Sequence, residues 1–273
     1  MSALVLTLRS RPAQRVDLGP LTTASLAGRS LSDIAGLALP SGNRALKLGE
    51  VFEVAGTPGG EIEIRNSCDQ LDRVGAGLTE GRLTVRGDAG AYLGAKLAGG
   101  TIVVNGSTGA WTGSGMTSGL IQVTGNAGDF LGGAVPGDHQ GMKGGTVVVG
   151  GNAGARAGDR MRRGALLIEG NAGDYVASRM VAGTIAVWGT VGAFPGLAMR
   201  RGTLLLRQAP TELLPTFNDC GQYPLNFLTL LARSWRGLPG KFATLPDGGY
   251  QVRRFMGDLA NGGRGEVLVW AKG

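Results

Sequence analysis

The chain has 273 residues, of which 42% are hydrophobic and 51 are glycine, and its net charge is +7 at pH 7. The glycine share is far above the usual ~7%, but the glycines recur at fixed intervals in an apolar background, so the composition excludes a disordered chain. No run of 18 apolar residues occurs, which excludes an ordinary membrane-spanning helix, and Cys68 and Cys220 form no CxxC pair of the kind found in metal sites.

The first 59 residues precede a repeat and differ from it. Residues 4–8 have the apolar content of a strand, Ser32–Leu39 is a short helix candidate, and Leu46–Val54 reads as a second strand. Residues 1–12 lack the long apolar stretch and cleavage site of a signal peptide, so we expect a cytoplasmic protein with reduced thiols. We expect this segment to cap the open end of the repeat, because an uncapped end would expose unpaired strand edges.

Seven glycines open seven successive segments, and five of the six intervals between them are 19 residues long. Counted from the opening glycine as zero, glycine also stands at offsets six and nine of every complete segment. The one interval of 26 residues is explained by seven extra residues at Val135–Gly141, and residues 60–80 read as a degenerate first copy with Ile62 and Ile64 as its apolar pair. The opening residues are Gly81, Gly100, Gly119, Gly145, Gly164, Gly183 and Gly202.

Offsets two and four of every segment are apolar, which predicts a short strand. Such a strand buries its inner face only when the next copy stacks on it, so the pattern predicts an all-β fold, a parallel solenoid of about seven coils. A hexapeptide acyltransferase would need multiples of about six residues and a calcium-binding RTX helix units of about nine, so neither fits.

Three further columns support the stacking, because equivalent positions of a parallel solenoid lie directly above one another. Offset seven carries Asp, Ser, Asn or Thr, which can form a ladder of side-chain hydrogen bonds. Offset sixteen is methionine after one leucine, and offset eleven is mostly aromatic. We expect both of these columns to be core.

After Gly202 a last partial coil begins, and residues 211–273 have another character. Leu225–Trp235 has helical spacing, and Tyr250–Arg254 and Glu266–Trp270 read as strands. The helix could cap the far end or dock on a partner. The sequence thus divides into an N-terminal cap (1–59), the repeat (60–210) and a C-terminal α/β tail (211–273).

Candidate catalytic groups are few. The single histidine, His139, lies in the insertion beside Asp138, and no second imidazole is available for a relay or a metal site. Asp129 and Asp174 share an offset but lie two coils apart, with no acidic cluster around them. We therefore predict no catalytic residue and no metal ligand, regard His139 as a possible contact residue, and rank a stand-alone carbohydrate-active enzyme as the weakest function class.

Basic residues concentrate at offsets fifteen to eighteen, where stacked coils would bring them into one patch. Such a patch attracts an acidic protein surface, a polyglutamate chain or phosphates, although a merely solvated face has the same composition. Nucleic acid is not favoured, because no aromatic residues alternate with the arginines. The members are Lys96, Lys143, Arg160, Arg162, Arg163, Arg179, Arg200 and Arg201.

Three stretches carry a resemblance to a known family: Gly42–Val54 (GNRALKLGEVFEV), Gly144–Gly154 (GGTVVVGGNAG) and Glu169–Val176 (EGNAGDYV). Together with the repeat run they resemble, over roughly residues 40–206, the C subunit of formylmethanofuran dehydrogenase and of the related formyltransferase/hydrolase complex. Both are similar to the GXGXG domain at the carboxyl end of the glutamate synthase large subunit.

The resemblance implies a right-handed parallel β-helix that scaffolds an assembly, with no catalytic residue, bound cofactor or metal in this chain. In the methylotroph complex, an amidohydrolase-like subunit hydrolyses a formylated methanofuran-type cofactor to formate, and a formyltransferase subunit exchanges the formyl group with tetrahydromethanopterin. In the archaeal dehydrogenase, molybdenum or tungsten pterin and iron–sulfur subunits carry out the redox step. The glutamate-rich tail of the furan cofactor is a candidate ligand of the basic patch. The stretches Arg253–Asp258 and Gly263–Val269 favour the methylotroph form.

Overall fold

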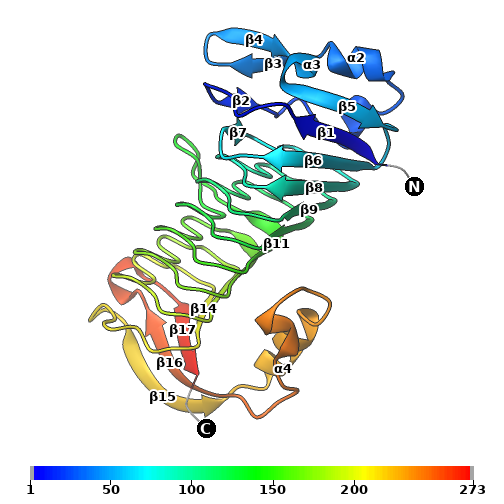
Figure 1. Ribbon diagram of the computed structural model, residues 1–273. Helices are drawn as coiled ribbons and strands as arrows, with labels where there is room; N and C mark the ends of the chain where they lie inside the picture. The colour runs from blue at the N-terminus through cyan, green and yellow to red at the C-terminus, as the bar shows by residue number, and fades with distance from the viewer. Residues whose placement is uncertain (1–2, 271–273) are drawn as a thin grey trace.

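A computed structural model describes residues 3–270. Residues 1–2 of the predicted cap and residues 271–273 of the predicted tail lie outside the described residues. Its main feature is one large, mostly parallel sheet of thirteen strands, seen edge-on in Figure 1 as a tall stack. The strand order is β15-β16-β17-β14-β13-β12-β11-β10-β9-β8-β6-β1-β5. No helix of residues 3–270 is both long enough and apolar enough to cross a bilayer.

Each segment of the repeat contributes one strand, as predicted. The strands pair in parallel with equivalent offsets opposite each other, so that Leu83 faces Ile102 and Ile102 faces Ile121. The residues at offsets two and four are at most 3% exposed throughout. The strands are β8 (Arg82–Gly87), β9 (Thr101–Val104), β10 (Leu120–Val123), β11 (Lys143–Val149), β12 (Arg163–Ile168), β13 (Thr184–Val187) and β14 (Thr203–Leu206).

The corner that follows each strand is held by the polar column at offset seven. The Asn126 side chain accepts a hydrogen bond from the Asn152 N–H at 2.8 Å, and Asn152 accepts from Asn171 N–H at 2.8 Å. One position later, a second line of parallel bridges links Ala127, Ala153 and Ala172. The predicted ladder is thus confirmed, and it ties successive segments together along a second line outside the strands.

Two glycine columns have different physical causes. Gly164, at offset zero, has φ +96°, a conformation that glycine adopts without the steric cost of a Cβ. Gly173, at offset nine, is instead too close to the neighbouring segment, because a Cβ there would lie 2.8 Å from Ala155 N and 2.9 Å from Gly154 C. Strand-to-strand stacking at backbone distance therefore requires glycine at offset nine.

The methionine column is core, as expected: Leu97, Met116, Met142, Met161, Met180 and Met199 are fully buried. The aromatic column is not, and this expectation was wrong. Its members are in the left-handed region, from φ +55° at Phe194 to +61° at Tyr92, and lie half-exposed on the outer surface. There they stack on one another, with Tyr92 and Trp111 5.1 Å apart and the Arg156 guanidinium 4.5 Å from the Tyr175 ring. The left-handed backbone directs these side chains out of the core.

The N-terminal segment covers one end of the stack (Figure 1). Strand β1 pairs antiparallel with β5 and parallel with β6, so this segment extends the repeat's own sheet. The predicted strand at residues 4–8 and the pairing of Ile62 and Ile64 with the repeat are confirmed. The elements are β1 (Leu4–Leu8), β2 (Val16–Asp17), α1 (Thr23–Leu26), α2 (Leu31–Ala35), β3 (Ala38–Ser41), β4 (Arg44–Lys47), α3 (Leu48–Val51), β5 (Phe52–Gly56), β6 (Glu61–Ser67) and β7 (Leu71–Asp72).

Two predicted boundaries in this segment were wrong. The helix expected at 32–39 is α2, which ends at Ala35, and Leu39 lies in strand β3. The strand expected at 46–54 is interrupted by the helical turn α3, where Glu50 accepts a hydrogen bond from the Lys47 N–H at 2.9 Å. This capping interaction favours a turn where apolar content alone suggested a continuous strand.

The C-terminal segment completes the other end of the sheet. Strand β17 pairs in parallel with β14, Leu204 facing Val267, and so takes the place of the next coil. Both predicted strands and the predicted helix are present, whereas β15 was not anticipated. The elements are β15 (Asn218–Pro224), α4 (Phe227–Ser234), η1 (Lys241–Thr244), β16 (Gln251–Gly257), η2 (Leu259–Asn261) and β17 (Gly265–Trp270).

Helix α4 covers the outer face of the sheet, rather than its end. Leu228 of α4 and Trp235, the residue directly after the helix, are 2% and 3% exposed. Both belong to a second apolar cluster, which includes Leu167 and Leu205, the outward residues of β12 and β14. Figure 1 shows α4 on the side of the stack near its C-terminal end. The helix therefore packs on its own chain and does not cap the end of the stack, while Leu230 remains 67% exposed.

Candidate functional site

The basic residues at offsets fifteen to eighteen follow a common local geometry. Offset fifteen is left-handed, with φ +56° at Arg160 and +52° at Arg179, and offset sixteen is the buried methionine. At the next two positions the charged residues, among them Arg162 and Arg163, are exposed. Because the uninterrupted segments repeat this turn, cations at these offsets emerge on the same surface.

Stacking aligns these turns between segments. The Arg162 N–H donates to the Met142 carbonyl, and the Arg200 N–H to the Met180 carbonyl, both at 2.8 Å. Between these two segments lies one that has Val181 and Ala182 at the equivalent positions. Rows of arginine therefore stand about 10 Å apart, two strand spacings, with a small apolar floor between them.

This arrangement encloses a hollow of about 640 Å³. A second hollow of about 370 Å³ adjoins it and shares Arg162, Val181 and Arg200 with the first. We call the two together the basic groove, lined by His139, Gln140, Lys143, Arg160, Arg162, Arg163, Arg179, Val181, Ala182, Ala198, Arg200, Arg201 and Asn261.

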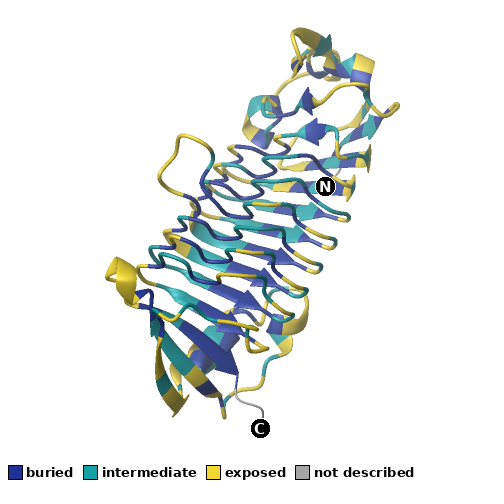
Figure 2. Ribbon diagram, turned by 90° about the vertical axis from the view of Figure 1, so that its left-hand side faces the viewer, coloured by how far each residue is buried: buried dark blue, intermediate teal, exposed yellow. Residues whose placement is uncertain are grey.

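The seven-residue insertion forms one wall of the groove. Ala134 occupies offset fifteen, because its N–H donates to the Asp159 carbonyl at 3.1 Å, and the Met142 N–H donates to Gly132 as in a regular segment. The inserted residues are thus 135–141, as predicted, and residues 136–140 form a fully exposed stretch that projects from the stack (yellow in Figure 2). The loop places His139 Nδ1 3.0 Å from Arg160 Nη1. Since arginine only donates, Nδ1 is the acceptor in this contact.

One of the seven groove cations is neutralised within the chain. Asp159, 1% exposed, accepts two hydrogen bonds from the Arg179 guanidinium at 2.9 and 2.7 Å, and a third from Ser178 Oγ at 2.7 Å. The other six have no carboxylate within 4 Å in residues 3–270, and Asp138 at the edge of the insertion is exposed. They are Lys143, Arg160, Arg162, Arg163, Arg200 and Arg201.

Seven of the eight cations of the predicted patch therefore line one groove, and His139 joins them. Lys96 does not, because it lies on a segment closer to the N-terminal end. Gln140 and Asn261 were missed by the sequence analysis. Asn261 comes from η2, where Asp258 Oδ2 accepts hydrogen bonds from Asn261 Nδ2 at 2.9 Å and from the Ala198 N–H at 3.0 Å. No periodic signal connects η2 with the repeat, so only the fold could reveal it.

The groove has the charge to bind anions, but its described lining residues form no recognisable catalytic or metal-binding group. Across residues 3–270 no group of three His, Cys, Asp or Glu side chains could hold a metal ion. Asp129 and Asp174, the acidic residues weighed as hydrolase candidates, each accept a hydrogen bond from a backbone N–H of the next segment at 2.8 Å. Their carboxylates therefore stabilise corners of the repeat.

Comparison with known proteins shows a similarity over nearly the whole chain. This chain is 55% identical over 264 residues to the C subunit of the formyltransferase/hydrolase complex Fhc of Methylorubrum extorquens. The alignment covers 97% of this chain and 98% of that protein. The crystal structure of that organism's FhcABCD complex with methylofuran contains a chain that matches with TM-score 0.93 and 44% identity over 98% of this chain and 100% of that one.

A more distant similarity covers only part of the chain. The C subunit of the tungsten-containing formylmethanofuran dehydrogenase 2 of Methanococcus maripaludis is 32% identical over 95 residues, 34% of this chain and 35% of that protein. The corresponding subunit of Methanothermobacter wolfeii is 34% identical over 98 residues. No family model matches the chain.

Proposed function

The chain belongs to the family of the C subunit of the formyltransferase/hydrolase complex, and from this premise we propose that it is a non-catalytic scaffold in such a complex. The observation that carries the proposal is the match of sequence and structure over almost the full length of both chains. The partial similarity to tungsten dehydrogenases spans about a third of the chain, so it gives less support to a redox complex.

Within the assembly, we propose that the chemistry is carried out by an amidohydrolase-like subunit and a formyltransferase subunit. The complex would convert formyl-tetrahydromethanopterin to formate through a methanofuran-type carrier, with any metal held in the other subunits.

We further propose that the repeat, residues 60–210, is a right-handed parallel β-helix between a cap at 1–59 and a tail at 211–273. The in-register parallel strands and the second line of bridges at offset eight support this architecture. Cys68 and Cys220 are free and half-buried, which suits a reducing compartment such as the cytoplasm.

For the basic groove, we propose that it binds a polyanion, with the glutamate-rich tail of the furan cofactor as the first candidate and an acidic partner surface as the second. Six cations without a carboxylate partner, distributed on both sides of an apolar floor, support the proposal. A chain of carboxylates lying along the groove could contact both rows of arginine.

The experiment that tests the scaffold role is purification of the tagged chain from its native host. We expect amidohydrolase-like and formyltransferase chains in stoichiometric amounts, identified by mass, and no turnover by this chain alone. Metal-pterin and iron–sulfur subunits in their place would instead identify a dehydrogenase. A lone chain with hydrolytic activity would overturn the scaffold role altogether.

A further inference from the structure

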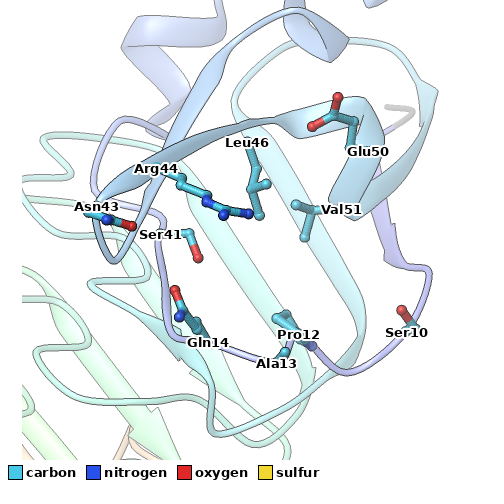
Figure 3. A pocket seen from close by; sticks show the side chains of 10 residues that line it. All are labelled: Ser10, Pro12, Ala13, Gln14, Ser41, Asn43, Arg44, Leu46, Glu50 and Val51. Carbon is cyan, nitrogen blue, oxygen red and sulfur yellow. The ribbon is translucent and has the colours of Figure 1, made fainter.

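A second hollow lies in the N-terminal segment, far from the basic groove along the stack. It has a volume of about 490 Å³ and lies between the loop after β1 and the hairpin of β3 and β4 (Figure 3). Its apolar floor includes Pro12, Leu46 and Val51, and Ser41 and Arg44 contribute polar groups. We call it the cap pocket.

Ser41 and Arg44 are polar side chains of the cap pocket that have no partner in residues 3–270. Ser41 is 6% exposed, yet its hydroxyl has no hydrogen-bond partner among the described residues. Figure 3 shows this hydroxyl directed into the hollow and the Arg44 guanidinium extending across it from the hairpin. Arg44 likewise has no ion pair in residues 3–270. The Ser41 hydroxyl oxygen is not among the fully buried, unpartnered polar atoms of residues 3–270, so it opens onto the hollow, and both groups are free to bind a ligand there.

The chemistry of that ligand follows from the lining. An arginine without a partner presents parallel N–H donors that fit a carboxylate, and the Ser41 hydroxyl can donate to the same group. Glu50 on the rim does not fill this role, since its carboxylate accepts from the Lys47 N–H and points away from the hollow in Figure 3. The floor of Pro12, Leu46 and Val51 suits an apolar neighbour of the carboxylate.

We propose that the cap pocket receives an acidic side chain or chain terminus, with an adjacent apolar side chain, from another subunit of the complex. This inference rests on the proposed function, because it needs an assembly. A protein segment fits better than a small molecule, since small ligands are usually largely enclosed and much of this rim is exposed: Ser10, Gln14, Asn43, Arg44 and Glu50. A net charge of +7 also favours acidic partners.

The test compares variants in the assembled complex. Arg44→Glu should raise the dissociation constant between this chain and the remaining subunits about tenfold or more, and Ser41→Ala by about threefold. The matched control is Arg82→Glu, the same charge change at an exposed arginine outside the pocket, which should leave the constant within about twofold. Unchanged thermal unfolding of each variant shows that the fold is retained.

A second measurement identifies the occupant. A photo-reactive phenylalanine analogue at Asn43, on the rim, should cross-link to a peptide of another subunit that contains Asp, Glu or a terminal carboxylate. Normal assembly of Arg44→Glu, a cross-linked segment without a carboxylate, or a cross-link to a second copy of this chain would each overturn the proposal. If the wild-type chain bound no other subunit, the scaffold role would fail first, and this inference with it.

Discussion

At the scale of single residues, backbone conformation decides which side chains leave the core. The positions at offsets eleven and fifteen have positive φ although many carry large side chains, such as Trp111 at +59° and Arg160 at +56°. This conformation costs about 1 kcal/mol or more for a residue with a Cβ. Every segment has positive φ at offset eleven, and every segment without the insertion has it at offset fifteen, where Ala134 is the exception. Aromatic stacking and the cations of the basic groove both depend on these turns.

Asp258 is the residue that connects the C-terminal segment with this turn. It is 2% exposed, and burial by itself would raise its pKa. The donors around the carboxylate, the Thr216 hydroxyl first and then the Ala198 N–H, Asn261 and the Ala260 N–H, outweigh burial and hold the pKa of Asp258 below its ordinary value. The carboxylate is therefore more stable in the folded chain than in the unfolded one.

This shift predicts a dependence of stability on acid. Because the folded-state pKa is lowered, the contribution of Asp258 is fully present above the unfolded pKa of about 3.9 and is lost as pH falls through the folded value. Asp258→Asn should lower the free energy of unfolding at pH 7 by about 1–3 kcal/mol and flatten its decrease below about pH 4. Urea denaturation at pH 7, 5 and 3.5 measures both.

Other carboxylates whose pKa is also lowered provide the background, since they titrate equally in the wild type and the variant. These are Asp33, Glu63, Asp219 and Asp247. Equal acid slopes for wild type and Asp258→Asn would contradict the role assigned to this carboxylate.

At the scale of elements, the inserted loop is an addition to a complete segment. The hydrogen bonds of Ala134 and Met142 match those of uninterrupted segments, so the repeat closes on either side of residues 135–141. The loop is held by the Gly141 N–H, which donates to the Arg160 carbonyl at 3.0 Å, and by the contact between His139 and Arg160. Its contribution is therefore to the groove wall and not to the core.

Deletion of residues 135–141 tests this assignment. The free energy of unfolding should change by about 1 kcal/mol or less, because shortening a surface loop has a small entropic effect. Affinity for poly-L-glutamate, measured by calorimetry, should fall about two- to fivefold as one wall of the groove is removed. His139→Ala in the intact loop serves as the control for the imidazole alone. Unfolding of the deletion variant would show that the loop is part of the core.

At the scale of the whole molecule, the two ends of the stack are closed by different means. The N-terminal segment adds β1 and β5 to the sheet, and the C-terminal segment supplies β17 as a substitute coil. Neither end of the repeat is left unpaired, so the free edges of the sheet are the antiparallel strands β5 and β15 and not strands of the repeat. The long surface between the two ends is then available for partners, with the basic groove on it.

Charge reversal at Arg162, Arg163, Arg200 and Arg201 tests the groove as a unit. Replacing all four by Glu should weaken binding of poly-L-glutamate about tenfold or more at low salt, and wild-type binding should itself fall as salt rises. The control reverses Lys96 and Arg82, which lie outside the groove and should have little effect. Equal affinities of the two variants would leave the groove as a merely solvated surface.

The sequence by itself determined the repeat, its register, the strands at offsets two and four, the methionine core and the seven cations that share one surface. Each depends on a local period, and stacking converts equal offsets into neighbours. The predicted boundaries near Leu39 and Leu48 were wrong because they were based mainly on apolar content. Apolar content does not reveal the capping interaction at α3, which interrupts the strand predicted at 46–54.

Only the tertiary structure decided the rest. The outward direction of the aromatic column depends on a left-handed backbone that residue type does not disclose. Helix α4 covers Leu167 and Leu205, and Asn261 lies at the basic groove, although these segments are distant in sequence. The cap pocket, with Ser41 and Arg44, likewise forms between segments that are separated along the chain. Such contacts have no period, because they form only once between surfaces that the folded chain brings together.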